Sequence, residues 1–262
     1  GVQTCALPIS SVTAALPGKV GYMYDSDWMN VQYTGLEDYQ YKTNYTESDS
    51  YLCSAYSWGV CGGYRFKPLS FFSIKPFAAY EYTYMSFDGK GLDGWYGTSL
   101  SNPSRISAYT DTSCRTKKSA SSDVTVISYK RESNIAWLGV EGTVTFPFGM
   151  DVTLGTQLSP FIYTVSIDDH YYNTEIGTGT EYADVCYGFF SALKLYSSVS
   201  YSFTNHIALC LYGSYLFYFQ PLRGDDYSKT IGADTYSKAA KVDGGANIWE
   251  FDTGLSAKYT FF

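Results

Sequence analysis

The chain of 262 residues lacks long apolar runs and is poor in charged side chains. No stretch approaches the roughly 18 consecutive apolar residues of a membrane-spanning helix, so the sequence predicts no such helix. Charged residues make up 16% of the chain, against about a quarter in an average protein. The formal net charge of -7 argues against nucleic-acid binding, which needs a basic patch, and is compatible with attracting basic polypeptides.

The chain contains six Cys, but their spacing gives no support for disulfides. Cys53 and Cys61 fall in one predicted strand, about 26 Å apart at about 3.3 Å per residue, whereas a disulfide needs Cα atoms about 4.4–6.8 Å apart. Cys186 and Cys210 lie in neighbouring predicted strands, at very different distances from the turn near Asn205. We interpret these Cys as small residues of the protein wall.

Aromatic residues are abundant, at 19% of the chain, with 28 Tyr and 16 Phe. Tyr suits a protein that meets lipid, headgroups and water, because its ring is apolar and its hydroxyl is polar. Girdles of such residues flank the apolar band of transmembrane barrels. The mean hydropathy of -0.16 fits a wall in which outward apolar residues alternate with inward polar ones.

Alternating apolar and polar residues recur in long segments along the chain. Strands are predicted at about 51–66, 74–87, 124–146, 150–166, 179–203, 207–220 and 247–262. Tight turns are expected at 67–70, 147–149 and 204–206, and long loops at 88–123, 167–178 and 222–245. Short turns on one side and long loops on the other are typical of outer-membrane barrels. Because these strands exceed the about 9–11 residues that cross a membrane, we expect them to project beyond it. The sequence therefore predicts an all-β fold, an antiparallel transmembrane β-barrel.

Residues of one parity in each strand are expected to face lipid, and those of the other parity the lumen. The outward set at 74–87 is Ile74, Ala78, Tyr80, Tyr82 and Tyr84, and the lumenal set is Lys75, Glu81 and Thr83. The amphipathic segment from Leu255 to Phe262 ends on aromatic residues. It resembles the signal that barrel-insertion machinery reads.

Only two His occur, and one of them has an acidic neighbour at strand spacing. His206 falls in a short inner turn, where we expect no role. His170 falls in an outer loop at the end of a strand, and Asp168 precedes it by two residues. Such a pair can share one face of the pleat, where the carboxylate fixes the tautomer of the imidazole and raises its basicity.

A second group of chemically useful residues lies in the outer segment Tyr24–Met29. Asp25 and Asp27 are two residues apart, so one of them can hold a proton and the two can polarise a water. The alternative interpretation is a solvated or cation-binding loop. Two or three carboxylates are few for calcium, which takes about 6–8 oxygen ligands.

The two groups together resemble the omptin family of outer-membrane proteases. The motifs are Asp-x-Asp-Trp-Met at 25–29 and Asp-x-His-Tyr at 168–171. The resemblance extends over nearly all of residues 18–262. It includes the approach from Gly21, Tyr129-Lys130, Gly139 with Gly142, and the ending Lys258–Phe261.

The resemblance implies a ten-stranded barrel, of which about eight strands are present here. It implies a bacterial outer-membrane endopeptidase of the aspartic type, expected to be a monomer among membrane lipid, with its site facing the exterior and polypeptides as substrates. Carried over residue by residue, Asp25 and Asp27 face Asp168 and His170 across a water. His170 would take the proton of that water, and Asp25 and Asp27 would position it and stabilise the oxyanion. The resemblance implies no Ser or Cys nucleophile, no metal and no cofactor.

Three positions depart from the family pattern. Ser166 stands where omptins have an acid that helps to recognise a basic residue before the scissile bond, so a preference for Arg or Lys cannot be carried over. Glu132 stands where a basic residue contacts lipopolysaccharide, so dependence on lipopolysaccharide cannot be carried over either. A Ser-x-His pair of the family has no match, since the region reads Lys42-Thr43-Asn44.

The start of the chain is expected to be foreign. Residues 1–10, GVQTCALPIS, lack the basic and apolar regions of a signal peptide and resemble a translated sequencing adapter. Residues 11–262 are then one barrel domain whose first two strands are missing, with 11–24 as the tail of the third. We expect an open or forcibly closed sheet of eight strands with unpaired edges.

Two other functional classes remain open at this point. A barrel that has lost its activity, acting as an adhesin or binding ligands at its rim, is favoured by Ser166 and by the missing Ser-x-His pair. The presence of all four matched residues favours the protease. A soluble β-sandwich would leave the loop alternation and the terminal aromatic strand as coincidences.

Overall fold

A computed structural model describes residues 9–26, 28–29, 41–42, 44–96, 115–171 and 177–259 of the chain. Its regular elements within these ranges are all β-strands. None of the described segments is a helix long and apolar enough to cross a membrane. The strands are β1 (Ile9–Ala15), β2 (Gly18–Asp25), β3 (Trp28–Met29), β4 (Tyr41–Lys42), β5 (Asn44–Gly63), β6 (Phe66–Leu69), β7 (Phe72–Tyr96), β8 (Thr116–Thr145), β9 (Met150–Tyr171), β10 (Gly179–Gly188), β11 (Ala192–Ser202), β12 (Ile207–Tyr218), β13 (Leu222–Thr230), β14 (Ser237–Ala246) and β15 (Trp249–Tyr259).

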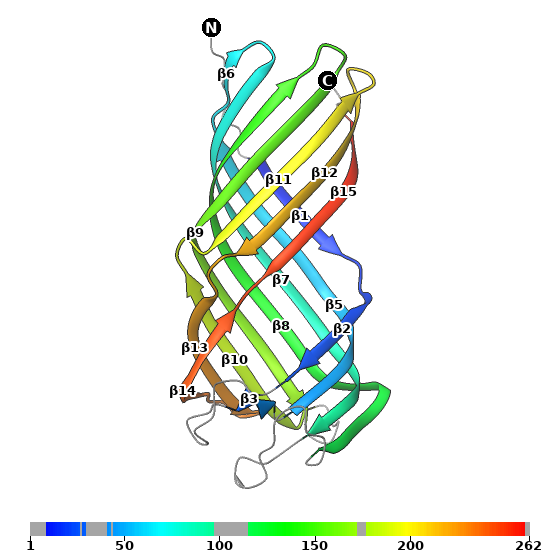
Figure 1. Ribbon diagram of the computed structural model, residues 1–262, viewed down its shortest axis with the longest axis vertical. Helices are drawn as coiled ribbons and strands as arrows, with labels where there is room; N and C mark the ends of the chain where they lie inside the picture. Colours follow the sequence, from blue (N-terminus) through cyan, green and yellow to red (C-terminus); the bar gives the residue numbers. More distant parts are fainter. Residues whose placement is uncertain are drawn as a thin grey trace.

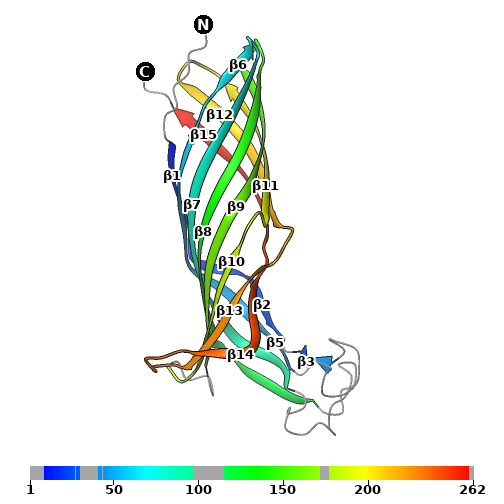
Figure 2. The same cartoon turned by 90° about the vertical axis from the view of Figure 1, so that its left-hand side faces the viewer.

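Thirteen of these strands form one long antiparallel sheet that curls around a central space (Figures 1 and 2). Strands β3 and β4 pair with each other in a separate two-stranded sheet. Strands β5, β7, β8 and β9 run through both halves of the sheet. In the half with the short turns the order is β1-β5-β7-β8-β9-β11-β12-β15, and in the other half it is β2-β5-β7-β8-β9-β10-β13-β14. The predicted all-β antiparallel fold is confirmed. Among the described residues no pairing joins β1 or β2 with β14 or β15, so the curled sheet has two edges there.

The parity predicted for the strands is confirmed by exposure. Leu138 and Val140 of β8 are 52% and 42% exposed on the outer face. On the opposite face, Lys75 of β7 and Glu141 of β8 form an ion pair of 3.3 Å, and both side chains are largely buried. Apolar residues thus coat the outside of the wall, and charged residues are sequestered on the inside.

The apolar coat ends partway along the strands. Tyr163 of β9 and Tyr187 of β10 face each other across the pair and are more than one third exposed. Beyond them, towards the long connections, the same parity carries Asp169 and Glu181. We take these Tyr as the border of the membrane band, so the part of the sheet beyond them lies outside it.

A cluster of buried residues fills the lumen midway along the barrel. It contains Ile135, Trp137, Ile162, Cys186, Ala192, Leu216, Tyr218 and Leu222. The cluster lies where the chain leaves β10 for β11 and β12 for β13. At the first of these breaks Phe190 has a φ of 50°, a left-handed conformation that is uncommon for a side chain of this size. The sequence pattern did not predict the first break, since it favoured one strand to about residue 203, but it did end a strand at about residue 220, close to the second break.

Several predicted loops are strands. The predicted loop 222–245 forms β13 and β14, and much of the predicted loop 88–123 extends β7 to Tyr96 and β8 back to Thr116. These extensions lie beyond the apolar band, where both faces of a ribbon meet polar surroundings and the alternation that marks a strand disappears. Four Cys in the described residues, Cys53, Cys61, Cys186 and Cys210, are free thiols, as their spacing predicted.

Candidate active site

Asp168 and His170 lie together on the lumenal face of β9. Oδ2 of Asp168 is 2.9 Å from Nε2 of His170, and about one third of each side chain is exposed. The ring of Tyr182 on β10 stands edge-on to the imidazole, with 5.3 Å between ring centroids. When Nε2 donates its proton to the carboxylate, Nδ1 is the ring nitrogen that can accept a proton. The pair is therefore both oriented and accessible to a substrate.

The sequence pattern placed this pair in a loop, and that placement was wrong. Strand β9 continues to Tyr171, and Asp168 pairs there with Tyr129 of β8 and Tyr182 of β10. Ladder hydrogen bonds on both sides hold the backbone of the pair in a fixed register. A site on paired strands is positioned more rigidly than one on a loop.

Asp25 is the last residue of β2. Strand β2 ends at the same end of the sheet as β9, whose last residues include the Asp168–His170 pair (Figure 1). The neighbours of Asp25, Tyr22 and Tyr24, are 58% and 61% exposed on the other face of the strand. Met23 shares the parity of Asp25, and a Cβ placed on Gly89 of β7 would lie 3.3 Å from its Sδ. The lumenal face of β2 therefore packs over β7 close to the end of the barrel that carries the pair. Asp27 lies outside the described residues.

A row of polar residues crosses four strands, one rung inward from Asp168. Ser166 of β9 pairs with Arg131 of β8 on one side and with Asp184 of β10 on the other. Asp184 in turn pairs with Asp226 of β13. The hydroxyl of Tyr129 donates a hydrogen bond to Oγ of Ser166, at 3.0 Å. The short Ser166 side chain thus separates a guanidinium from two carboxyls.

A cavity of about 270 Å³ opens from this row to the Asp168–His170 pair. Its lining residues are Tyr129, Arg131, Ser166, Asp168, Tyr182, Asp184, Gly245, Ala246 and Asn247. Asp168 belongs to both the pair and the cavity, so a group bound in the cavity can contact the carboxylate that pairs with the imidazole. We call this space the rim cavity.

Burial raises the pKa of the Asp184 carboxyl, and the negative charges of Asp226 and Asp168 raise it further. Burial also raises the pKa of Asp226, although a backbone hydrogen bond from Tyr227 opposes the shift. These groups lie outside the apolar band.

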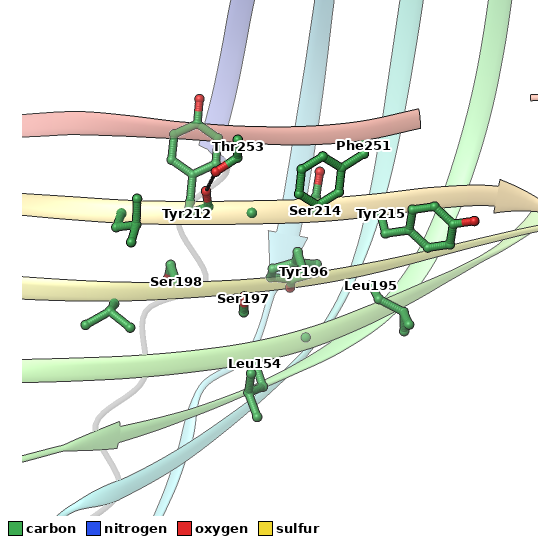
Figure 3. A pocket seen from close by; sticks show the side chains of 14 residues that line it. Leu154, Leu195, Tyr196, Ser197, Ser198, Tyr212, Ser214, Tyr215, Phe251 and Thr253 are labelled. Carbon is green, nitrogen blue, oxygen red and sulfur yellow. Dashed lines mark hydrogen bonds between the residues drawn. The ribbon is translucent and has the colours of Figure 1, made fainter. Parts of the chain in front are cut away.

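A larger hollow, of about 610 Å³, lies against β9, β11, β12 and β15 (Figure 3). It is bordered by side chains such as Leu154, Leu195 and Phe251, and Thr253 donates a hydrogen bond to the backbone oxygen of Tyr212 at its edge. Its described lining includes no carboxyl, imidazole, ammonium or guanidinium group. It therefore offers little for acid–base chemistry, and the rim cavity is the better candidate site.

Sequence reasoning identified Ser166, Asp168 and His170 but missed Arg131 and Asp184. Both side chains belong to the set of alternating residues that faces the lumen. A charged residue at such a position, near the outer end of a strand, was the feature of the sequence that could have identified them. His206, assigned no role, lies in the turn after β11, where its backbone N–H donates to Oγ1 of Thr204 at 3.1 Å.

Comparisons with known proteins agree with one another. The model of the omptin family matches residues 8–261 of the chain. The structure is similar to the crystal structure of the outer membrane protease OmpT from Escherichia coli, with a TM-score of 0.71 and 16% sequence identity. The match covers 96% of this chain and 79% of that one. No curated protein sequence matches the chain.

Proposed function

The chain belongs to the omptin family, and on this premise we propose that it is an endopeptidase of the bacterial outer membrane that cleaves polypeptides at the rim of its barrel. Two findings support the proposal. The similar structure is that of an outer membrane protease. The outer face of the wall is apolar where a barrel meets lipid, and the long connections lie at the same end as the candidate site.

The observation that carries the proposal is the 2.9 Å contact between Asp168 and His170 beside a cavity that can hold part of a substrate. In the proposed reaction His170 accepts a proton from a water, whose oxygen attacks the carbonyl carbon of the scissile bond. The carbon–nitrogen bond then breaks, and His170 returns the proton to the leaving amine. Asp168 holds the imidazole in one tautomer and stabilises its protonated form, as the acid of a triad does.

Asp25 and Asp27 complete the proposed site as its aspartic-type half. Two carboxyls two residues apart do not readily ionise together, so one of them can stay protonated and donate a hydrogen bond. We assign them to positioning the water and to stabilising the negative oxygen of the tetrahedral intermediate. In this arrangement the active site faces the outside of the cell, and extended polypeptides reach it from there.

Replacing His170 with Ala tests the proposal. Without a general base, the rate of peptide cleavage should fall about 100- to 10,000-fold, while the barrel remains folded. Cleavage of a mixed peptide library by the purified protein, folded in detergent, measures the effect.

His206→Ala provides the matched control, because it removes the other His of the chain from a turn at the opposite end of the barrel. It should cleave like the unchanged protein. Equal cleavage by the His170→Ala protein would contradict the mechanism. Binding of peptides without cleavage by the unchanged protein would favour a ligand-binding barrel instead.

A further inference from the structure

Two residues that line the rim cavity, Arg131 and Asp168, have buried hydrogen-bonding atoms that lack partners. Nε and Nη2 of Arg131 are buried and have no hydrogen-bond acceptor in the structure as described. Oδ1 of Asp168 is likewise buried and has no donor among the described residues. Leaving such groups unpaired destabilises the folded protein, and the cost is greater when the groups are charged. Protein interiors rarely retain this cost without a use for the groups.

The architecture of the row explains why these groups do not satisfy each other. Arg131 and Asp184 are separated by the intervening strand β9, which places their Cα atoms about 10 Å apart at the usual strand spacing. Between the described residues, no ion pair within 4.0 Å joins Arg131 to Asp168 or Asp184. Ser166, the residue between them, is too short to bridge the gap and accepts its hydrogen bond from Tyr129. The gap therefore remains open to a group from outside.

The carboxyl of Asp184 lines the cavity and lies close to the backbone of β14. A Cβ on Gly244 of β14 would come within 2.6 Å of Oδ1 of Asp184, so a larger residue there would require the carboxyl to move. Asp184 has no ion pair within the described part of the chain. One wall of the rim cavity is thus a donor wall made by Arg131, and the other is an acceptor wall made by Asp168 and Asp184.

A cationic or an anionic ligand would each fit only half of this cavity. The ammonium or guanidinium of a substrate could pair with Asp184, but it would meet the unpaired guanidinium of Arg131 across about 10 Å of strand. A carboxylate could pair with Arg131, but it would face the carboxyls of Asp168 and Asp184.

A primary amide satisfies both walls at once, since its oxygen accepts hydrogen bonds and its NH₂ group donates two. We propose that the rim cavity is a subsite for a neutral amide side chain, Gln or Asn, of the substrate. The guanidinium of Arg131 donates to the amide oxygen, and the amide nitrogen donates to the carboxyls of Asp184 and Asp168. The volume of about 270 Å³ accommodates such a side chain, as it equals about nine waters at about 30 Å³ each. This inference rests on the proposed function only in taking the ligand to be a polypeptide.

Binding to the His170→Ala protein tests the subsite without cleavage. The probes are peptides that are identical and uncharged except for one central residue, which is Gln, Asn, Lys, Arg, Glu or Leu. The Gln or Asn peptide should bind at least about tenfold more tightly than any of the others, the effect of hydrogen bonds to a charged group. A preference for Lys, Arg or Glu, or no discrimination, overturns the proposal.

Variants test whether Arg131 is responsible for the preference for an amide side chain. Arg131→Met removes the donors and should abolish the preference for the amide, and Arg131→Lys should reduce it because it keeps the charge but loses the forked geometry. Arg65→Met, which changes a lumenal arginine of the other half, should retain it. Loss of the preference in the Arg65→Met protein together with its retention in both Arg131 variants would exclude the rim cavity as its origin.

The same peptides offered to the unchanged protein separate the two proposals. Cleavage beside Lys or Arg would refute the amide subsite and leave the endopeptidase standing. Amide-selective binding with no cleavage would refute the endopeptidase and leave the subsite standing.

Discussion

Two charged residues of the lumen, Glu141 in one half and Arg131 in the other, have opposite hydrogen-bonding surroundings. In the half with the short turns, Glu141 accepts hydrogen bonds from Lys75 at 3.3 Å and from the hydroxyl of Tyr196 at 3.1 Å, and it forms an ion pair with Arg65 at 3.6 Å. In the outer half, the guanidinium of Arg131 has two buried nitrogens without acceptors in the described structure. The same wall thus holds a carboxylate with three partners in one half and a guanidinium with two unpaired nitrogens in the other, with the buried cluster between them.

This contrast distinguishes charged residues that stabilise the fold from charged residues that can bind a ligand. A lumenal charge that has all its partners holds strands together and has no capacity left for a ligand. A lumenal charge that lacks partners lowers stability, and a protein keeps it where a substrate supplies the missing atoms. Stability measurements on the two halves should therefore give effects of different size and of opposite sign.

The largest effect is expected for Glu141→Ala in the satisfied half. Removing the carboxylate leaves Lys75 unpaired, although its side chain is only 17% exposed. Breaking one side of such a pair should lower the free energy of unfolding by about 3 kcal/mol. The temperature at which the folded barrel unfolds in detergent, read from its shifted mobility on a gel, measures this. An unchanged temperature would mean that the network does not support the wall.

A smaller loss is expected for Trp137→Phe at the border between the halves. The indole Nε1–H donates to Oε2 of Glu81 at 3.1 Å, and Trp137 is 2% exposed. Phe keeps most of the packing but leaves the carboxylate of Glu81 without this donor, at a cost of about 1–2 kcal/mol. The same unfolding assay applies. Glu81→Gln with Trp137→Phe should recover part of the loss, and failure to recover any would show that packing, not the hydrogen bond, was affected.

The sequence predicts this contrast only in part. Alternation identified the strand at 74–87 and its lumenal Lys75 and Glu81, because in the apolar band one face must be apolar and the other polar. It missed β13 and β14, where neither face meets lipid and the alternation is lost. The satisfied half was therefore easier to predict than the outer half.

Some residues of the candidate site could likewise be predicted from the sequence, and others could not. Asp168 and His170 are two residues apart on one strand, so period-two geometry alone places them on one face. Arg131, Ser166 and Asp184 come together only through the register of β8, β9 and β10. That register is set by cross-strand packing, which local sequence does not specify. A specificity pocket built from three strands is thus less visible in a sequence than a catalytic motif within one strand.

The smallest effect, and one of opposite sign, is expected for Asp184→Asn in the unsatisfied half. Burial first, and then Asp226 and Asp168, raise the pKa of Asp184 above the value of about 3.9 in an unfolded chain. A group with a raised pKa contributes stability below its unfolded pKa and loses that contribution as pH rises through its folded pKa. Asn does not ionise, so the variant should be more stable than the unchanged protein at neutral pH, by less than about 1 kcal/mol.

Measuring the difference in stability at several pH values distinguishes the loss of the Asp184 charge from other effects of the substitution. The gap in unfolding temperature between the Asp184→Asn protein and the unchanged one should be smallest near pH 4 and grow towards pH 7. A gap that stays constant across this range would attribute the gain to packing against Gly244. A loss of stability at neutral pH would contradict the comparison itself, because it would show that Asp184 is as well satisfied in the outer half as Glu141 is in the other.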